Sequence, residues 1–305
     1  MRSVHPTPFI VGVALIAIAL APLGLKNYGL YLLTLWCVYV MAGMGLNLTL
    51  GYAGQMSIGH AAFLGIGAYT AAILMKLGWS FWLVLPAAAL LCFAVGLVLG
   101  FPALRVQHHY LAFATLGFNV LMFLFFRNEE WLTGGTFGIS GIPRPPLFDG
   151  SGAYFYFAYA STIVLALILA WIIRSPWGRA FAALRDNPIR AESLGVNIMA
   201  YTLLAFAIGA AFAGIAGAYF ASLVEFIEPA PFSLTSSLMM LLMVIVGGSG
   251  RFFGPMLGAA IVVLLPEWLR VMKDWYLVMF GLAVVALMIW LPGGLLSIPE
   301  RLRRA

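Results

Sequence analysis

The chain has 305 residues, of which 64% are hydrophobic and only 9% are charged, and its net charge is +6. A soluble domain usually carries about 25% charged residues, so this composition excludes an ordinary soluble protein and indicates a chain embedded in lipid. The excess of basic residues does not predict nucleic-acid binding, because cytoplasmic loops of membrane proteins are rich in Lys and Arg. Cys37 and Cys92 fall within apolar runs and are interpreted as small hydrophobic residues.

Apolar runs that can cross a bilayer recur along the whole chain. A spanning helix needs about 20 apolar residues, so we expect an all-α polytopic membrane protein with about ten transmembrane helices in one domain, residues 1–305. The predicted spans are 9–25, 28–50, 58–75, 81–99, 106–126, 153–173, 200–224, 232–246, 253–269 and 275–290. The first run, which follows Arg2, also resembles a signal peptide. We expect it to be retained, and its cleavage would leave the remaining topology unchanged.

The distribution of basic residues predicts the orientation of these spans. With the N-terminus inside and ten crossings, 10 Lys and Arg residues lie inside and 6 outside. Cytoplasmic loops carry the excess of such residues, so both termini are predicted to be cytoplasmic. This orientation makes residues 175–196 a cytoplasmic segment and residues 127–152 an external loop.

A glycine-rich stretch at residues 45–60 joins the second and third predicted spans without a hydrophilic loop. Its glycines weaken a continuous helix, and a broken helix is tolerated inside a membrane only where it faces protein or a water-filled cavity. Two interpretations remain open for Asn47, Gln55 and Ser57: they line or gate a translocation path, or they satisfy one another between closely packed helices. His60, a lone ionisable residue, is expected to be structural.

Two further features bear on the interior. Thr115 and Asn119 lie four residues apart and therefore share one helix face. They either line the same path or form a hydrogen bond between helices, and the second interpretation is favoured. Gly247 and Gly250 belong to a second glycine cluster that, like the first, joins two spans. The similarity of the two clusters hints at a duplicated architecture.

The predicted external loop, residues 127–152, is rich in glycine and proline and contains the sequence TGGTFGISGIPRPP. Such residues disfavour long helices or strands and favour a compact cap made of turns. We expect four apolar side chains to pack this cap onto the membrane domain: Trp131, Phe137, Ile139 and Ile142.

The segment 175–196 is a polar island between two apolar runs. Ser175-Pro176 and Asn187-Pro188 each place a capping residue before a proline at the first helical position. They predict two short helices, at about 176–185 and 188–194, with Gly195 as the stop. Helices this short need a docking surface to be stable, which favours a cytoplasmic partner over a simple basic loop.

Catalysis is not expected. No acidic or basic residue lies well inside a predicted span, no metal-ligand set occurs and no Walker A motif is present. The absence of buried charge also argues against a proton-coupled pump. The chain is therefore predicted to be no enzyme, and either a passive channel or a permease powered from outside.

Three motifs then resemble a known family. The sequence GRAFAALRDNPIRAESLGVN resembles the cytoplasmic coupling segment of ABC-transporter permeases, LNLTLGYAGQMSIGHAAFLGIGAY resembles the hallmark stretch of the branched-chain amino acid permeases, and TGGTFGISGIPRP is similar to the external loop of the LivM branch rather than the LivH branch. The likeness covers nearly the whole chain. It implies that the coupling segment docks into a groove on an ATPase subunit through these residues: Arg179, Leu184, Arg185, Asp186, Asn187, Pro188, Arg190, Ala191, Glu192, Leu194 and Gly195.

The resemblance also implies the partners and the cargo. We expect a membrane subunit of a bacterial inner-membrane ABC importer for branched-chain or similar amino acids, with a second, LivH-type permease, two ATPase subunits and a periplasmic binding protein. This chain would bind no cofactor, because ATP and Mg²⁺ would be bound by the ATPases. The alternatives are a related importer of urea or short amides and, behind it, a stand-alone channel.

Overall fold

The computed structural model describes residues 18–103, 110–269, 281–282, 285 and 293–297, and this part of the chain is mostly helical. The helices are α2 (Asn27–Leu46), α3 (His60–Lys76), α4 (Phe81–Ala103), α5 (Tyr110–Asn128), α6 (Glu130–Thr133), α7 (Ser151–Arg174), α8 (Pro176–Asp186), α9 (Pro188–Ser193), α10 (Ile198–Val224), α11 (Leu234–Gly248) and α12 (Gly254–Leu269). A π-helical turn, Asn47–Tyr52, extends α2. Two short strands are β1 (Ile139–Ser140) and β2 (Phe226–Ile227).

Five described helices are long and apolar enough to cross a membrane: α2 with its π-helical turn, α4, α5, α7 and α10. Three shorter apolar helices, α3, α11 and α12, account for further predicted spans. Residues 9–17 of the predicted span 9–25, and most of the span 275–290, lie outside the described residues. The structure therefore supports a polytopic membrane protein, whereas the count of ten spans stays a prediction.

Helix α10 packs against α2, α3 and α4. Small residues make the close approach possible: a Cβ atom on Gly45 of α2 would lie 2.4 Å from the backbone oxygen of Gly209 on α10. Backbones that approach this closely are typical of helix pairs in membranes. The neighbouring helix α4 instead exposes large side chains such as Leu90 and Val98.

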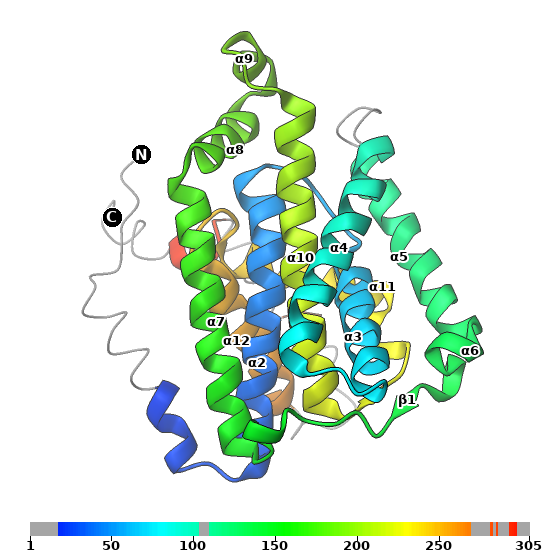
Figure 1. The fold of residues 1–305 in the computed structure, drawn as a ribbon. Helices are drawn as coiled ribbons and strands as arrows, with labels where there is room; N and C mark the ends of the chain where they lie inside the picture. Colours follow the sequence, from blue (N-terminus) through cyan, green and yellow to red (C-terminus); the bar gives the residue numbers. More distant parts are fainter. Residues whose placement is uncertain (1–17, 104–109, 270–280, 283–284, 286–292, 298–305) are drawn as a thin grey trace.

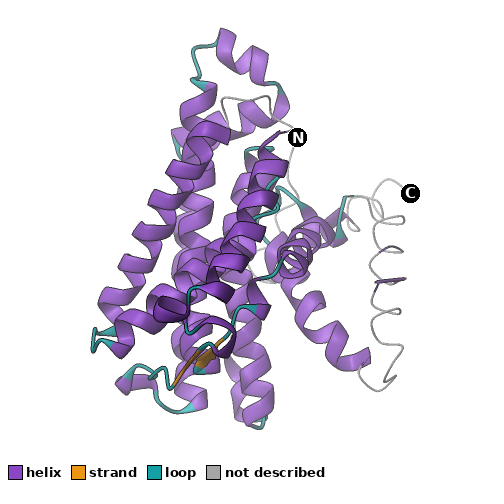
Figure 2. Ribbon diagram, turned by 90° about the vertical axis from the view of Figure 1, so that its right-hand side faces the viewer, coloured by secondary structure: helices purple, strands orange, loops and turns teal. Residues whose placement is uncertain are grey.

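The two ends of the helix bundle differ (Figure 1). Helices α8 and α9 project from one end, which we call the α8–α9 end, whereas the paired strands β1 and β2 lie at the opposite end. Figure 2 shows the same bundle from the side, with the two strands near its lower edge.

The segment between α5 and α7 forms a turn-rich cap, as its composition predicts. Its strand β1 pairs antiparallel with β2, Ile139 opposite Ile227. Gly138 permits this pairing because its φ is +68°, and a Cβ there would lie 2.2 Å from the Ile227 oxygen. The prediction for the aromatic residues of the cap is wrong. Ile142 is buried, but Trp131 and Phe137 are 80% and 83% exposed, so they do not pack the cap onto the bundle.

Candidate coupling segment and interior polar residues

The coupling segment, residues 175–196, folds into two short helices because of its local capping signals. The Ser175 hydroxyl accepts a hydrogen bond from the Trp177 N–H at the start of α8, and the Asn187 side chain accepts one from the Arg190 N–H at the start of α9. A proline follows each cap. Gly195, with φ of +85°, ends the segment in the left-handed region that favours glycine.

The residues predicted to contact an ATPase divide into three groups by their exposure. Leu184 and Ala191 are buried and hold the two helices in place. The exposed members are Arg179, Arg185, Asp186, Arg190, Glu192, Leu194 and Gly195. Asn187 and Pro188 are half-buried and begin α9. Ile189, which the sequence reasoning left out, is 75% exposed beside Leu194 at 82%.

Arg185 is exposed, but its side chain reaches back from α8 to the bundle. Its guanidinium donates a hydrogen bond to the carbonyl of Gly51, in the π-helical turn after α2. A Cβ on Gly250, in the turn between α11 and α12, would collide with the same guanidinium, and one on Gly54 would lie 3.2 Å from the Arg185 Cα. One side chain of the coupling segment therefore contacts both glycine-rich breaks between helices, the first at residues 45–60 and the second at residues 247–250.

Asn47 joins those two breaks directly. Its side-chain nitrogen donates to the Arg251 oxygen at 2.9 Å, and its side-chain oxygen accepts from the Gly250 N–H at 2.8 Å. Asn47 is fully buried, and both of its polar atoms are engaged. This geometry favours the interpretation that Asn47 satisfies groups between packed segments.

The other predicted path residues lie at two places. The Gln55 side chain donates to the Thr202 oxygen on α10 at 2.9 Å, close to the α8–α9 end. The Thr115 hydroxyl accepts a hydrogen bond from the Ile58 N–H at 3.0 Å, so Thr115 lies beside the backbone of the residue that follows Ser57. Asn119, one turn further along α5, donates to the Phe232 oxygen at 3.4 Å. These bonds between segments agree with the favoured interpretation of Thr115 and Asn119.

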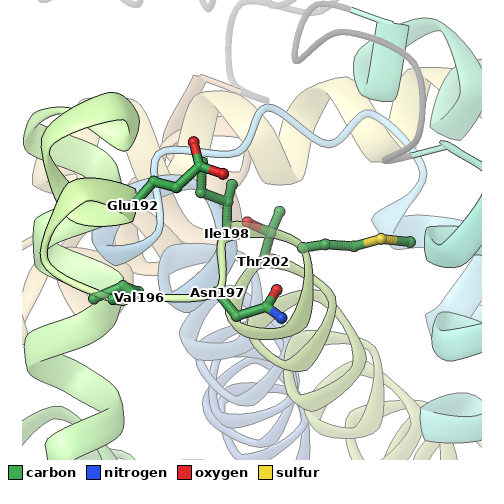
Figure 3. Close-up of a pocket in the computed structure, with 7 residues that line it drawn as sticks. Glu192, Val196, Asn197, Ile198 and Thr202 are labelled. Carbon is green, nitrogen blue, oxygen red and sulfur yellow. The ribbon is translucent and has the colours of Figure 1, made fainter.

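A surface pocket of ≈ 490 Å³ lies where α9 passes into α10 (Figure 3). Glu192 comes from α9, and Asn197, Ile198 and Thr202 come from the start of α10. The pocket adjoins Gln55 through Thr202. It belongs to the same face as the exposed residues of the coupling segment.

Arg144 fastens the cap to the bundle at the opposite end. Its Nε lies 2.7 Å from a Glu225 carboxylate oxygen, and its guanidinium also donates to the carbonyls of Ser222 and Leu223 at the end of α10. Carbonyls at a helix C-terminus attract a cation. The Arg of the IPRP motif thus has a structural role that the sequence alone did not show.

Among the described residues, no group of three or more His, Cys, Asp or Glu side chains is placed to hold a metal ion. The interior polar side chains are amides, hydroxyls and one imidazole. Such groups can bind a polar solute by hydrogen bonds.

Comparison with known proteins identifies the family. Residues 28–291 match the family model described as the permease component of the branched-chain amino acid transport system. The chain belongs to this permease family. The high-affinity branched-chain amino acid transport system permease protein LivM of Escherichia coli K12 is 36% identical over 93% of this chain and 74% of its own length. LivM of Salmonella typhimurium LT2 is also 36% identical, over 93% of this chain and 73% of its own length.

More distant relatives of the permease are similar over less of the chain. The autoinducer 2 import system permease protein LsrC of Salmonella paratyphi B is 28% identical over 81% of this chain and 73% of its own length. No solved structure matches the permease. The relatives are transport permeases by name, which agrees with a chain that transports rather than catalyses.

Proposed function

We propose that the permease is the LivM-type membrane subunit of an ABC importer that carries leucine, isoleucine, valine or similar amino acids across the bacterial inner membrane. The similarity to LivM over most of the chain supports this cargo. A second, LivH-type permease completes the membrane part, and both termini of this chain lie in the cytoplasm. A periplasmic binding protein delivers the substrate to the face that carries the cap.

The coupling segment receives the mechanical work. Two ATPase subunits bind ATP and Mg²⁺, and this chain binds neither. Ile189 and Leu194 present exposed apolar surface next to the charged Arg190 and Glu192. Exposed apolar residues with a polar rim are typical of a protein-binding surface. We therefore assign the outer face of α9 to the groove of an ATPase.

The observation that carries this proposal is the position of Arg185. A basic loop that merely followed the positive-inside rule would need no specific contact with the membrane domain. Arg185 instead contacts the turns at Gly51 and Gly250, one before α3 and the other after α11. Movement of the coupling segment would thus reach both short helices at once.

The test replaces Arg185 in the complete importer, reconstituted in liposomes. Arg185→Glu removes the bond to Gly51 and places a carboxylate against a carbonyl, so we expect ATP hydrolysis to lose its stimulation by the loaded binding protein. The matched control is Lys26→Glu, the same change of charge at an exposed site before α2. Wild-type stimulation in Arg185→Glu, at normal abundance in the membrane, would refute the coupling role.

The cargo and the partners are tested separately. We expect the importer to accumulate labelled leucine and not labelled urea, and accumulation of urea alone would assign the chain to the urea and amide branch. Purification in mild detergent should recover the ATPase subunits with the permease. A permease that purifies as a self-sufficient oligomer and conducts without them would be a channel.

A further inference from the structure

The short helices α3 and α11 begin next to each other inside the bundle. The backbone N–H of Ala61, in the first turn of α3, donates to the Ser237 hydroxyl in the first turn of α11 at 2.9 Å. With 17 and 15 residues they are about 25 and 22 Å long, shorter than the roughly 30 Å core of a bilayer. Both helices are therefore shorter than the about 20 residues of a typical spanning helix.

From this meeting point the two helices run to opposite ends of the bundle. Met75, at the end of α3, accepts a hydrogen bond from Ser222 near the end of α10, on the β1–β2 side. Gly248, at the end of α11, leads into Gly250, which lies against Arg185 at the α8–α9 end. Together, α3 and α11 therefore resemble one membrane span that is interrupted in the middle, with the N-termini of both helices at the interruption.

Helix α5 closes the third side of this meeting point. Thr115 bonds to the Ile58 N–H just before α3, and Asn119 bonds to the Phe232 oxygen just before α11. Asn119 lies nine residues from Tyr110 and nine from Asn128, the two described ends of α5, so the meeting point is near the middle of the bundle. We call Ser57, His60, Thr115, Asn119 and Ser237 the polar junction.

Three atoms of the polar junction have no hydrogen-bond partner in the described part of the chain: the Ser57 hydroxyl, the His60 Nε2 and the Asn119 side-chain oxygen. All three side chains are at least 97% buried. Native proteins leave few buried polar atoms without a partner, and the exceptions are often functional. Three such atoms around two helix N-termini indicate groups that bond to something in another state of the protein.

An aromatic cluster adjoins the polar junction. Phe232, whose carbonyl accepts from Asn119, packs against Phe126, Tyr69 and Phe220 with ring centroids about 6 Å apart. The site therefore combines dipoles and hydrogen-bonding groups with apolar rings, and it holds no fixed charge. This combination fits an α-amino acid with an apolar side chain.

We propose that the polar junction binds the α-amino and α-carboxylate groups of the transported amino acid when the ends of α3 and α11 separate. Helix N-termini attract a carboxylate, and the Ser57 hydroxyl can donate to it. The Asn119 oxygen and the His60 Nε2 accept from the ammonium. The aromatic cluster takes the apolar side chain. The proposal rests on the proposed function, because it requires an amino acid as the cargo.

Ser57→Ala gives the sharpest test. If Ser57 is only structural, loss of an unpartnered buried hydroxyl leaves the importer as stable and as active as before. If it binds substrate, leucine transported per ATP hydrolysed falls about tenfold, the size of one lost hydrogen bond to a charged group. Stimulation of ATP hydrolysis by the loaded binding protein stays, since Arg185 and its contacts with Gly51 and Gly250 are untouched.

Two further variants complete the experiment. Asn119→Leu should lower the same ratio, whereas the matched control Thr162→Val, which removes a buried hydroxyl bonded within α7, should not. Wild-type ratios in both Ser57→Ala and Asn119→Leu would overturn the proposal. A loss of stability in Ser57→Ala without a loss of transport would also overturn the proposal. Ser57 would then bond only to a buried water molecule and have a structural role. If the wild-type importer carries no amino acid, the result refutes the proposed function itself, before the variants test the polar junction.

Discussion

Asn47 offers a quantitative test of how the two glycine-rich breaks are held together. In Asn47→Ala, the Gly250 N–H and the Arg251 carbonyl both lose their hydrogen bond to the Asn47 side chain. A backbone group left without a partner in a buried place costs about 1–3 kcal/mol. Gly250 and Arg251 are half-buried, so water reaches them in part. We therefore take the lower values and expect a loss of about 2–3 kcal/mol for the two groups together.

That loss should be visible as a shift in the unfolding temperature. A change of 1 kcal/mol lowers Tm by about 2–4 °C in domains of a few hundred residues, which gives a fall of roughly 4–12 °C. The assay is thermal unfolding of the complete importer in detergent, followed by size-exclusion chromatography. Leu90→Ala on the exposed face of α4 is the control. If Asn47→Ala unfolds at the same temperature as that control, the two hydrogen bonds do not hold the two glycine-rich breaks together, and the reasoning is wrong.

Two other predictions concern the two ends of the bundle. Arg144→Met removes the ion pair with Glu225 and the bonds to the end of α10, so the cap should become sensitive to limited proteolysis while the helices stay intact; an unchanged digestion pattern would contradict the role of Arg144. Ile189→Asp places a charge on the exposed tip of the coupling segment and should abolish co-purification of the ATPase subunits, whereas Ile189→Val should retain it. Equal recovery of the ATPases with both variants would remove Ile189 from the interface.

The sequence predicts those features that depend on neighbouring residues. The two helices of the coupling segment follow from Ser175-Pro176 and Asn187-Pro188, because a cap and a proline act within one turn. Gly195 ends the segment for the same local reason. The turn-rich cap is likewise predicted from its glycines and prolines.

Contacts between distant segments escape that reasoning. Arg185 and Gly51 are 134 residues apart, and nothing in either motif indicates that they meet. The meeting of α3 and α11 depends on the path of the whole chain between them. Hydrophobicity also fails to separate core from surface here, because a lipid-facing side chain is as apolar as a buried one. Trp131 and Phe137 illustrate this limit, because both are apolar and yet 80% and 83% exposed.

The β1–β2 pairing has a mechanical consequence. Strand β2 leads through a short 3-10 turn, Ala230–Phe232, directly into the start of α11. Strand β1 belongs to the cap, so the cap and the entry to α11 are joined by backbone hydrogen bonds rather than by a loose tether. A displacement of the cap would therefore be transmitted to α11, whose other end leads to Gly250 beside Arg185. Helix α11 thus connects the cap at one end of the bundle with the contact of Arg185 at the other.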